Sequence, residues 1–103
     1  MNRSQALALA HEYKKILLAA GIPILDVRLF GSMALDRSTE ESDIDIAVIT
    51  QAFLPSIHDE NTVLRKLRRP LSRRIETVCL HTEDLNNKYF TLAQEVKEHG
   101  ISV

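Results

Sequence analysis

The most informative part of this chain is residues 29–48, which read LFGSMALDRSTEESDIDIAV. An apolar pattern typical of a strand runs into Gly31-Ser32, a polar segment follows, and a second strand pattern begins at Asp43. Strand residues two apart point to the same face of a sheet, so Asp43 and Asp45 are expected on one face, opposite the core. Two carboxylates this close repel each other, and the pair therefore predicts a bound cation.

The chemistry of the two motifs in this stretch is complementary. Magnesium prefers hard oxygen ligands and is held in proteins by carboxylates together with substrate phosphates. Two such ions about 4 Å apart can clamp the entering and leaving oxygens of a phosphoryl transfer. Glycine allows the backbone to approach a phosphate closely, and the hydroxyl and N–H groups of a following helical turn can bind phosphate oxygens. Asp43, Asp45, Gly31 and Ser32 therefore predict metal-assisted attack on a nucleotide.

Hydrophobic periodicity on either side of this stretch predicts a small mixed β-sheet flanked by helices, an α/β (α+β) fold. The expected elements are a helix over 4–20, strands over 25–30 and 43–49, a loop over 35–42, a helix over 58–68, a strand over 74–80, a final helix from Thr82 to Gly100 with Tyr89 on its inward stripe, and a short strand over 101–103. Neither a linker nor a repeat interrupts the pattern, so residues 1–103 are expected to form one domain.

Composition narrows the class of protein. Hydrophobic residues make up 45% of the 103 residues, charged residues make up 26%, and the net charge is −1, which gives no strong signal for nucleic acid or membrane as the partner. No segment approaches the roughly 20 apolar residues of a membrane span, and no signal peptide is recognised. Cys79 is the only cysteine and is expected to be a buried thiol. A reducing cytoplasm is the expected location.

Two further features have competing interpretations. The run over 65–74 contains six basic residues, which indicates either a solvated helix end or a contact for triphosphate, RNA or an acidic partner. No cluster of Cys and His residues has the spacing of zinc ligands. The four histidines are expected to be structural or surface residues, and His81, just after the third strand, is the strongest candidate for another role.

The chain resembles the DNA polymerase β-like nucleotidyltransferases. The resemblance rests on Gly31-Ser32, ten intervening residues and Asp43-Ile44-Asp45, the family's G-S-x10-D-x-D signature. The stretches over 29–34 and 42–48 look especially like the minimal nucleotidyltransferases, and the order of elements extends the likeness over nearly the whole chain. The resemblance implies two magnesium ions and a nucleoside triphosphate, with ATP as the expected substrate.

The resemblance also implies further site residues. The family's third carboxylate lies on the next strand, where this chain has Glu76 instead of the usual aspartate. Asp43, Asp45 and Glu76 are then the expected metal ligands and catalytic residues, with Gly31 and Ser32 on the nucleotide. The family often has Arg-Gly where this chain has Leu35-Asp36, and Arg37 is the expected compensating contact to the triphosphate.

Minimal family members resemble antitoxins paired with a small helical HEPN ribonuclease toxin. The resemblance implies transfer of AMP to a tyrosine hydroxyl on such a toxin, which silences it. A catalytic domain this small must use the surface of its acceptor or form a homo-oligomer. Two alternatives remain open: a catalytically degenerate module that neutralises its partner by contact, and the catalytic subunit of a nucleotidyltransferase that modifies an antibiotic or another small molecule.

Overall fold

The computed structural model describes residues 1–35, 37, 39 and 42–103. The elements in chain order are α1 (Arg3–Ala19), β1 (Ile24–Phe30), α2 (Gly31–Ala34), β2 (Ile44–Thr50), α3 (Ile57–Leu67), β3 (Ile75–Leu80), α4 (Thr82–Leu85), α5 (Thr91–His99) and β4 (Ile101–Ser102). This architecture confirms the predicted small mixed sheet flanked by helices. Within the described part of the chain, no helix combines the length and the apolar composition that crossing a bilayer requires.

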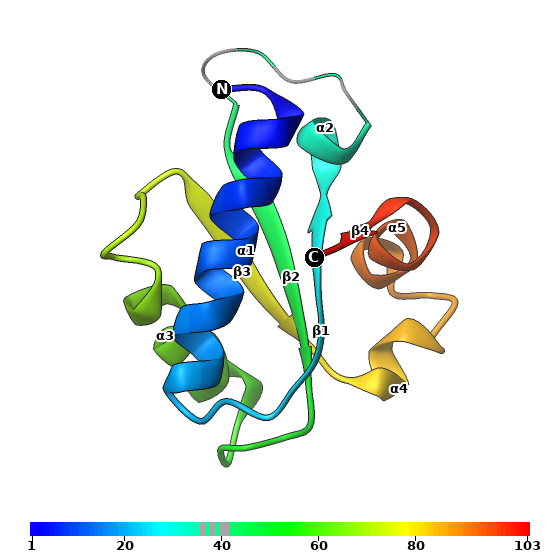
Figure 1. Cartoon of the computed structure of the whole chain (residues 1–103). Coiled ribbons are helices and arrows are strands. Elements are labelled where there is room, and N and C mark those ends of the chain that lie inside the picture. Colours follow the sequence, from blue (N-terminus) through cyan, green and yellow to red (C-terminus); the bar gives the residue numbers. More distant parts are fainter. Residues whose placement is uncertain (36, 38, 40–41) are drawn as a thin grey trace.

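The four strands form one sheet in the order β3-β2-β1-β4. β1 runs antiparallel to β2 and to β4, whereas β2 and β3 are parallel and are joined through α3. Parallel neighbours need such a crossover, because a short turn can join only antiparallel strands. Figure 1 shows α1 and α3 on one side of the sheet and α5 on the other. The sheet is therefore the middle layer of the molecule.

Alternating side chains of β2 fill two separate clusters. Ile44, Ile46 and Val48 pack with α1 and α3, while Ala47 and Ile49 pack with α5. Since alternate strand residues point to opposite faces, Asp45 belongs to the α5 side of the sheet. Asp45 therefore lies on the opposite face from Ile44 and Ile46, as predicted. Asp43 lies just before the strand begins.

A buried tyrosine joins three elements on the α1 side. The hydroxyl of Tyr13 donates to the carbonyl of Leu64 at 2.6 Å and lies 3.2 Å from the Thr77 hydroxyl. Burial raises the pKa of Tyr13 to about 12, so its phenol stays neutral across the physiological range. Through this contact α1 fixes both α3 and β3, the strand that carries Glu76.

The prediction of one continuous final helix was wrong. α4 ends at Leu85 and α5 begins only at Thr91, because the Gln94 side chain donates to the carbonyls of Leu85 and Asn87 and stabilises the intervening turn. Tyr89 lies in this connection and is 82% exposed, so it is not part of an inward stripe. The short strand at the C-terminal end was predicted correctly, as β4.

Candidate active site

The end of β1 and the beginning of β2 meet at Gly31. Phe30 pairs with Asp45 in the antiparallel register, which brings the glycine beside the Asp45 side chain. Gly31 has a φ of +71°, a backbone conformation that favours glycine. A Cβ built there would lie 3.1 Å from Cγ of Asp45 and would overlap one of its carboxylate oxygens. Glycine is therefore required both for the turn and for the close approach of the Asp45 carboxylate.

Other carboxylates surround Asp45. In the parallel register Asp45 pairs with Glu76, and directly paired residues project to the same face. Partial burial, together with the negative charges of Asp43, Glu76 and Glu95, raises the pKa of Asp45 from 3.8 to about 6. The structure therefore brings together the three acids that the sequence singled out.

The surroundings of the three acids differ. Asp43 and Glu76 are exposed, whereas Asp45 is only partly accessible. No described residue donates a hydrogen bond to the Asp45 side chain or forms an ion pair with it. A carboxylate left among other carboxylates lacks the compensating charge that partly buried acids normally have. Oxygen-only donors of this kind suit a magnesium ion.

Arg3, in the first turn of α1, forms two hydrogen bonds to the helical turn that contains Gly31 and Ser32. Arg3 donates from Nε to the carbonyl of Met33 at 3.2 Å and from Nη2 to the carbonyl of Ala34 at 2.8 Å. These carbonyls close α2, the single helical turn that contains Gly31 and Ser32. Arg3 thereby fixes α2 against α1, a role that no feature of the sequence around Arg3 could have indicated.

The predicted triphosphate contact Arg37 is exposed, and its backbone N–H donates to the carbonyl of Ser32 at 2.8 Å. This bond keeps the start of the loop close to α2. The Ser32 hydroxyl makes no hydrogen bond to another described residue. Asp36, the predicted acid beside the phosphate path, lies outside the described residues.

Sequence reasoning missed two other residues near the acids. Arg74 donates from Nη2 to the carbonyl of Ser42 at 2.5 Å and accepts at its own carbonyl from the Ile44 N–H at 2.9 Å, which fixes the backbone on both sides of Asp43. Glu95 comes from α5, the helix that covers this face of the sheet. A charged residue on an amphipathic helix gives no signal that it will lie near a distant strand.

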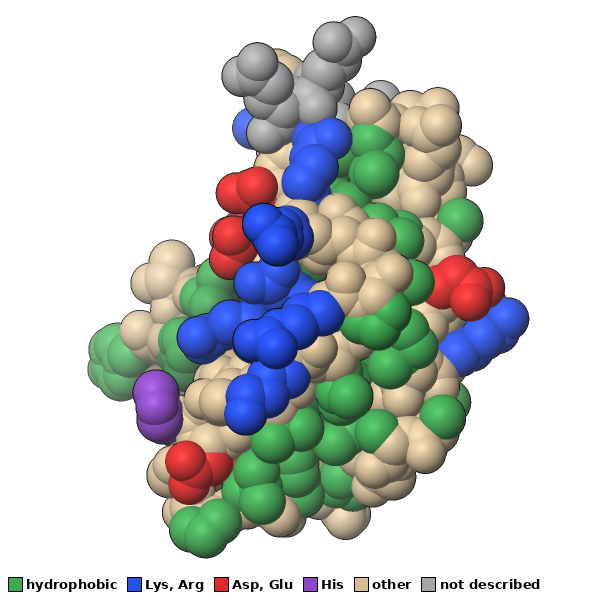
Figure 2. Space-filling model, turned by 90° about the vertical axis from the view of Figure 1, so that its left-hand side faces the viewer, with side chains coloured by type: hydrophobic (Ala, Val, Ile, Leu, Met, Phe, Trp, Pro, Cys, Tyr) green, Lys and Arg blue, Asp and Glu red, His purple; other side chains and the backbone are tan. Residues whose placement is uncertain are grey.

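Two side chains in the basic run over 65–74 donate hydrogen bonds to the protein's own backbone. Arg68 and Arg74 make hydrogen bonds to backbone carbonyls, and Arg74 supports the segment before β2. Figure 2 shows Lys and Arg side chains gathered in a band on the α3 side of the molecule. A shallow pocket of about 160 Å³ on α3 is lined by Thr62, Arg65, Lys66, Arg68 and Arg69. The interpretation of this run as a binding surface stays a prediction.

His81 does not join the carboxylate site. Its imidazole Nε2 lies 2.9 Å from a carboxylate oxygen of Glu60, close to the Cys79 thiol. Cys79 is buried, as predicted. This cluster could not be predicted from the sequence, because Glu60 is 19 residues before Cys79 and belongs to a different element.

Comparison with known proteins agrees with this geometry. The family model described as polymerase β, nucleotidyltransferase matches residues 9–103. A protein assigned as a nucleotidyltransferase from Sulfolobus solfataricus superposes with a TM-score of 0.68 at 18% identity, over 97% of this chain and 80% of that chain. This likeness shows the fold.

A second solved structure is that of a toxin–antitoxin with AMP-PNP. It superposes with a TM-score of 0.65 at 26% identity, over 90% of this chain and 70% of that chain. No curated protein matches this sequence. With a family match over residues 9–103 and carboxylates gathered beside a glycine turn, the chain belongs to the polymerase β nucleotidyltransferase family.

Proposed function

We propose that this chain is a magnesium-dependent nucleotidyltransferase that transfers AMP from ATP to a hydroxyl group on a protein. The observation that carries the proposal is the Asp45 carboxylate seated against Gly31, with Asp43 and Glu76 close enough to raise its pKa. Family membership supports nucleotidyl transfer as the reaction class. The nature of the acceptor is our inference.

The three acids fit the expected metal. Asp43, Asp45 and Glu76 offer only carboxylate oxygens, which is the donor set that magnesium prefers, and two ions are expected between them and the phosphates. Bound magnesium would neutralise phosphate charge and lower the pKa of the attacking hydroxyl. After partial burial, the negative charges of Asp43 and Glu76 are the next causes of the raised pKa of Asp45, and a bound cation would offset them.

The residues around the acids have distinct roles in the proposal. The N–H groups of the Gly31 turn and the Ser32 hydroxyl bind the terminal phosphates of ATP, and Arg37 adds a positive charge to them. Arg3 and Arg74 touch no substrate; they position α2 and the segment before β2 through backbone carbonyls.

The proposed step is an in-line displacement. The acceptor oxygen forms a bond to the α-phosphorus of ATP while the bond from that phosphorus to pyrophosphate breaks. Where Glu76 acts as general base, the hydroxyl proton passes to its carboxylate; where Glu76 would instead hold a metal ion, the proton passes to solvent. Glu76 is exposed, so an acceptor on the surface of a large molecule can reach it.

The proposed acceptor is a tyrosine hydroxyl of a small helical HEPN-type toxin in the cytoplasm, which AMP transfer silences. Support comes from the structural likeness to a toxin–antitoxin complex that was solved with AMP-PNP, an analogue of ATP. The open position of the acids fits a protein acceptor, because the described part of the chain has no second domain to enclose a small substrate.

The test is an ATP transfer assay with magnesium and labelled α-phosphate, using a co-expressed HEPN-type partner. Wild type should label the partner, the Asp43→Ala/Asp45→Ala variant should not, and the exposed-acid control Glu12→Ala should retain labelling. Binding of the partner without label would indicate a contact module instead. Label on an aminoglycoside but not on the protein would indicate a small-molecule enzyme. Label that survives the double substitution would overturn the proposed mechanism.

A further inference from the structure

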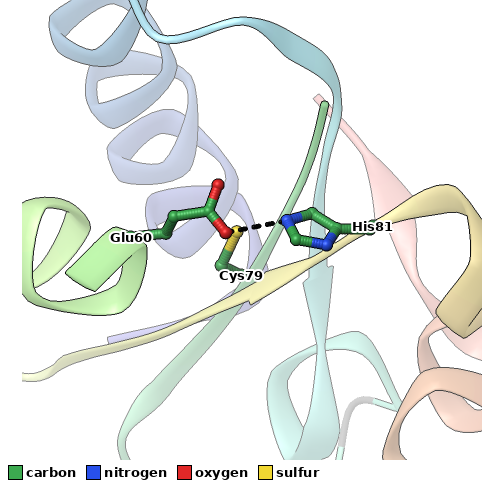
Figure 3. A group of neighbouring side chains, drawn as sticks. All are labelled: Glu60, Cys79 and His81. Atoms are coloured by element: carbon green, nitrogen blue, oxygen red, sulfur yellow. Dashed lines mark hydrogen bonds and ion pairs between the residues drawn. The ribbon is translucent and has the colours of Figure 1, made fainter. Parts of the chain in front are cut away.

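Three potential metal ligands converge at the end of β3 that is far from Glu76. Figure 3 shows Glu60 reaching from α3 toward Cys79 and His81. One ligand atom from each residue lies within 4.8 Å of the others. Relative exposure is 1% for Glu60 and 3% for Cys79, and the His81 side chain is 23% exposed. The cluster is therefore nearly closed, with access past the imidazole.

The charge of Glu60 needs compensation. A buried carboxylate is costly unless it is paired or coordinates a metal. Among the residues that the structure describes, its one ion-pair partner is His81, with 2.9 Å between Nε2 and Oε1. Its other oxygen accepts from the backbone N–H of Phe53 at 2.8 Å, which fixes the carboxylate in this orientation.

Neighbouring groups also hold the other two ligand residues. The Cys79 N–H donates to the Asn61 side chain at 2.9 Å, and the Cys79 thiol lies 3.3 Å from the Thr50 hydroxyl. The His81 N–H donates to the Asp84 carboxylate at 2.8 Å. The two backbone bonds fix the chain at Cys79 and His81, and the Thr50 hydroxyl is the outer partner of the thiol itself, as outer contacts are in built metal sites.

We propose that Glu60, Cys79 and His81 form a zinc site, separate from the carboxylates that face magnesium. Thiolate, imidazole and carboxylate are the ligands of protein zinc, whereas magnesium takes oxygen ligands almost alone. One thiolate, one carboxylate and a neutral imidazole balance the charge of Zn²⁺ in a buried place. The Cys79 thiol proton is released to solvent on binding, and water completes the coordination.

The distances are compatible with this assignment. Ligands at about 2.0–2.3 Å from a tetrahedral zinc lie about 3.3–3.8 Å apart. The three ligand atoms already lie within 4.8 Å of one another. Side-chain rotations that move each atom by about 1 Å would bring them to the spacing of zinc ligands. Burial raises the pKa of the Cys79 thiol, so without metal it is a neutral thiol in a hydrogen-bonded network.

The proposed zinc site has a structural role. Cys79 belongs to the cluster on the α1 and α3 side of the sheet, whereas Asp45 and Glu76 lie toward α5. Zinc would clip α3 to β3 and would touch neither ATP nor the acceptor. Zinc binding should therefore raise the thermal stability of the chain without any nucleotide present.

Cobalt(II) is the probe for the test, since it occupies zinc sites and reports a thiolate ligand by a charge-transfer absorption band. The chelator-treated chain of residues 1–103, kept reduced, is titrated with Co²⁺. Because Cys79 is the only cysteine, the band can arise from no other residue. We expect the band to saturate at one Co²⁺ per chain, Zn²⁺ to abolish it, and Zn²⁺ to raise the melting temperature.

Variants separate this site from other metal binding. Cys79→Ser should lose the band, and both it and His81→Ala should bind Zn²⁺ at least about tenfold more weakly, since even outer-shell changes cost that much. His58→Ala, which removes an exposed histidine on the same helix as Glu60, should bind Zn²⁺ like wild type. A wild-type chain without the band overturns the proposal, as does unchanged Zn²⁺ affinity in Cys79→Ser.

The first of these outcomes is read on wild type and so does not depend on how the variants fold. The assay contains no nucleotide, magnesium or partner, so failure of the zinc site and failure of the proposed AMP transfer are distinguishable.

Discussion

Asp45 and Glu60 are both withdrawn from water, yet their surroundings are opposite. Glu60 is buried on the α3 side, where the Phe53 N–H and the His81 imidazole contact its two oxygens. Asp45 lies against Gly31 with three acids nearby and receives no hydrogen bond from any described residue. The fold supplies both oxygens of Glu60 with partners of its own, whereas it supplies no hydrogen-bond donor from the described residues to Asp45.

The largest expected effect tests this contrast directly. Asp45→Asn should lower the rate of AMP transfer by about 10³-fold, which corresponds to about 4 kcal/mol of lost transition-state stabilisation. The free energy of unfolding should not fall in metal-free buffer, because the change removes a charge from a repelling group. Chemical denaturation and the labelled-ATP assay measure the two quantities. A stability loss comparable to that of Glu60→Gln would contradict the contrast.

The next effect concerns the glycine that lies under Asp45. Gly31→Ala forces a Cβ onto the carboxylate and should reduce transfer by about 10²-fold, equivalent to about 3 kcal/mol. Gly21→Ala is the matched control, because Gly21 also has a positive φ, of 80°, but nothing lies within 4 Å of the added atom.

Both glycine variants should lose about 1–2 kcal/mol of stability from backbone strain. Gly21→Ala alone should keep the wild-type transfer rate. Equal loss of activity in the two would mean that strain, and not the displaced carboxylate, impairs the site.

Glu60→Gln should reduce the free energy of unfolding by about 1–3 kcal/mol in metal-free buffer, since it weakens a buried charge-assisted pair. The control is Glu12→Gln, an exposed acid 3.3 Å from Lys15, where a change below about 0.5 kcal/mol is expected. Urea denaturation monitored by circular dichroism gives both values. If the two variants are equally stable, the contacts of Glu60 contribute nothing to the free energy of unfolding.

The smallest effect is on pH dependence. The pKa of Asp45 is raised from 3.8 to about 6, so the folded chain holds this proton more tightly than the unfolded chain. The contribution of Asp45 is therefore fully present below about pH 4 and is lost as the pH rises through about 6. Screening by water at this partly exposed group keeps it below about 1 kcal/mol.

The measurement compares wild type with Asp45→Asn at pH 5 and pH 7, with a chelator present. Wild type should lose more stability over this interval than the variant does. Saturating magnesium should reduce the difference. Parallel pH curves would show that Asp45 is not in a repelling environment.

Most of the fold could be predicted from local sequence patterns. The alternation over 43–49 and the turn at Gly31-Ser32 placed β2 and α2 to within a residue, because period-2 burial and glycine conformation are local properties. The final helix was predicted wrongly, since its interruption depends on Gln94, which bonds to carbonyls seven and nine residues earlier. Side-chain contacts at such separations leave no periodic signal.

The candidate site divides in the same way. Asp43 and Asp45 could be singled out because two acids separated by one residue at the start of a strand are visible in the sequence, and Glu76 followed from the family resemblance. Arg3, Glu95 and the partners of Glu60 act across the sheet or between helices. Their positions follow from strand order and helix packing, which a single sequence does not specify.

Because of the two hydrogen bonds from Arg3, the Gly31-Ser32 turn depends on whether the first turn of α1 is formed. α2 has only four residues and cannot persist alone, so it should share the local opening free energy of the N-terminal end of α1. Amide exchange at Leu35 and Arg37, whose N–H groups donate to the carbonyls of Gly31 and Ser32, should consequently accelerate in Arg3→Ala, while amides in the middle of β2 remain protected. An arginine in the first turn of α1 would thus set how long the Gly31-Ser32 turn stays formed.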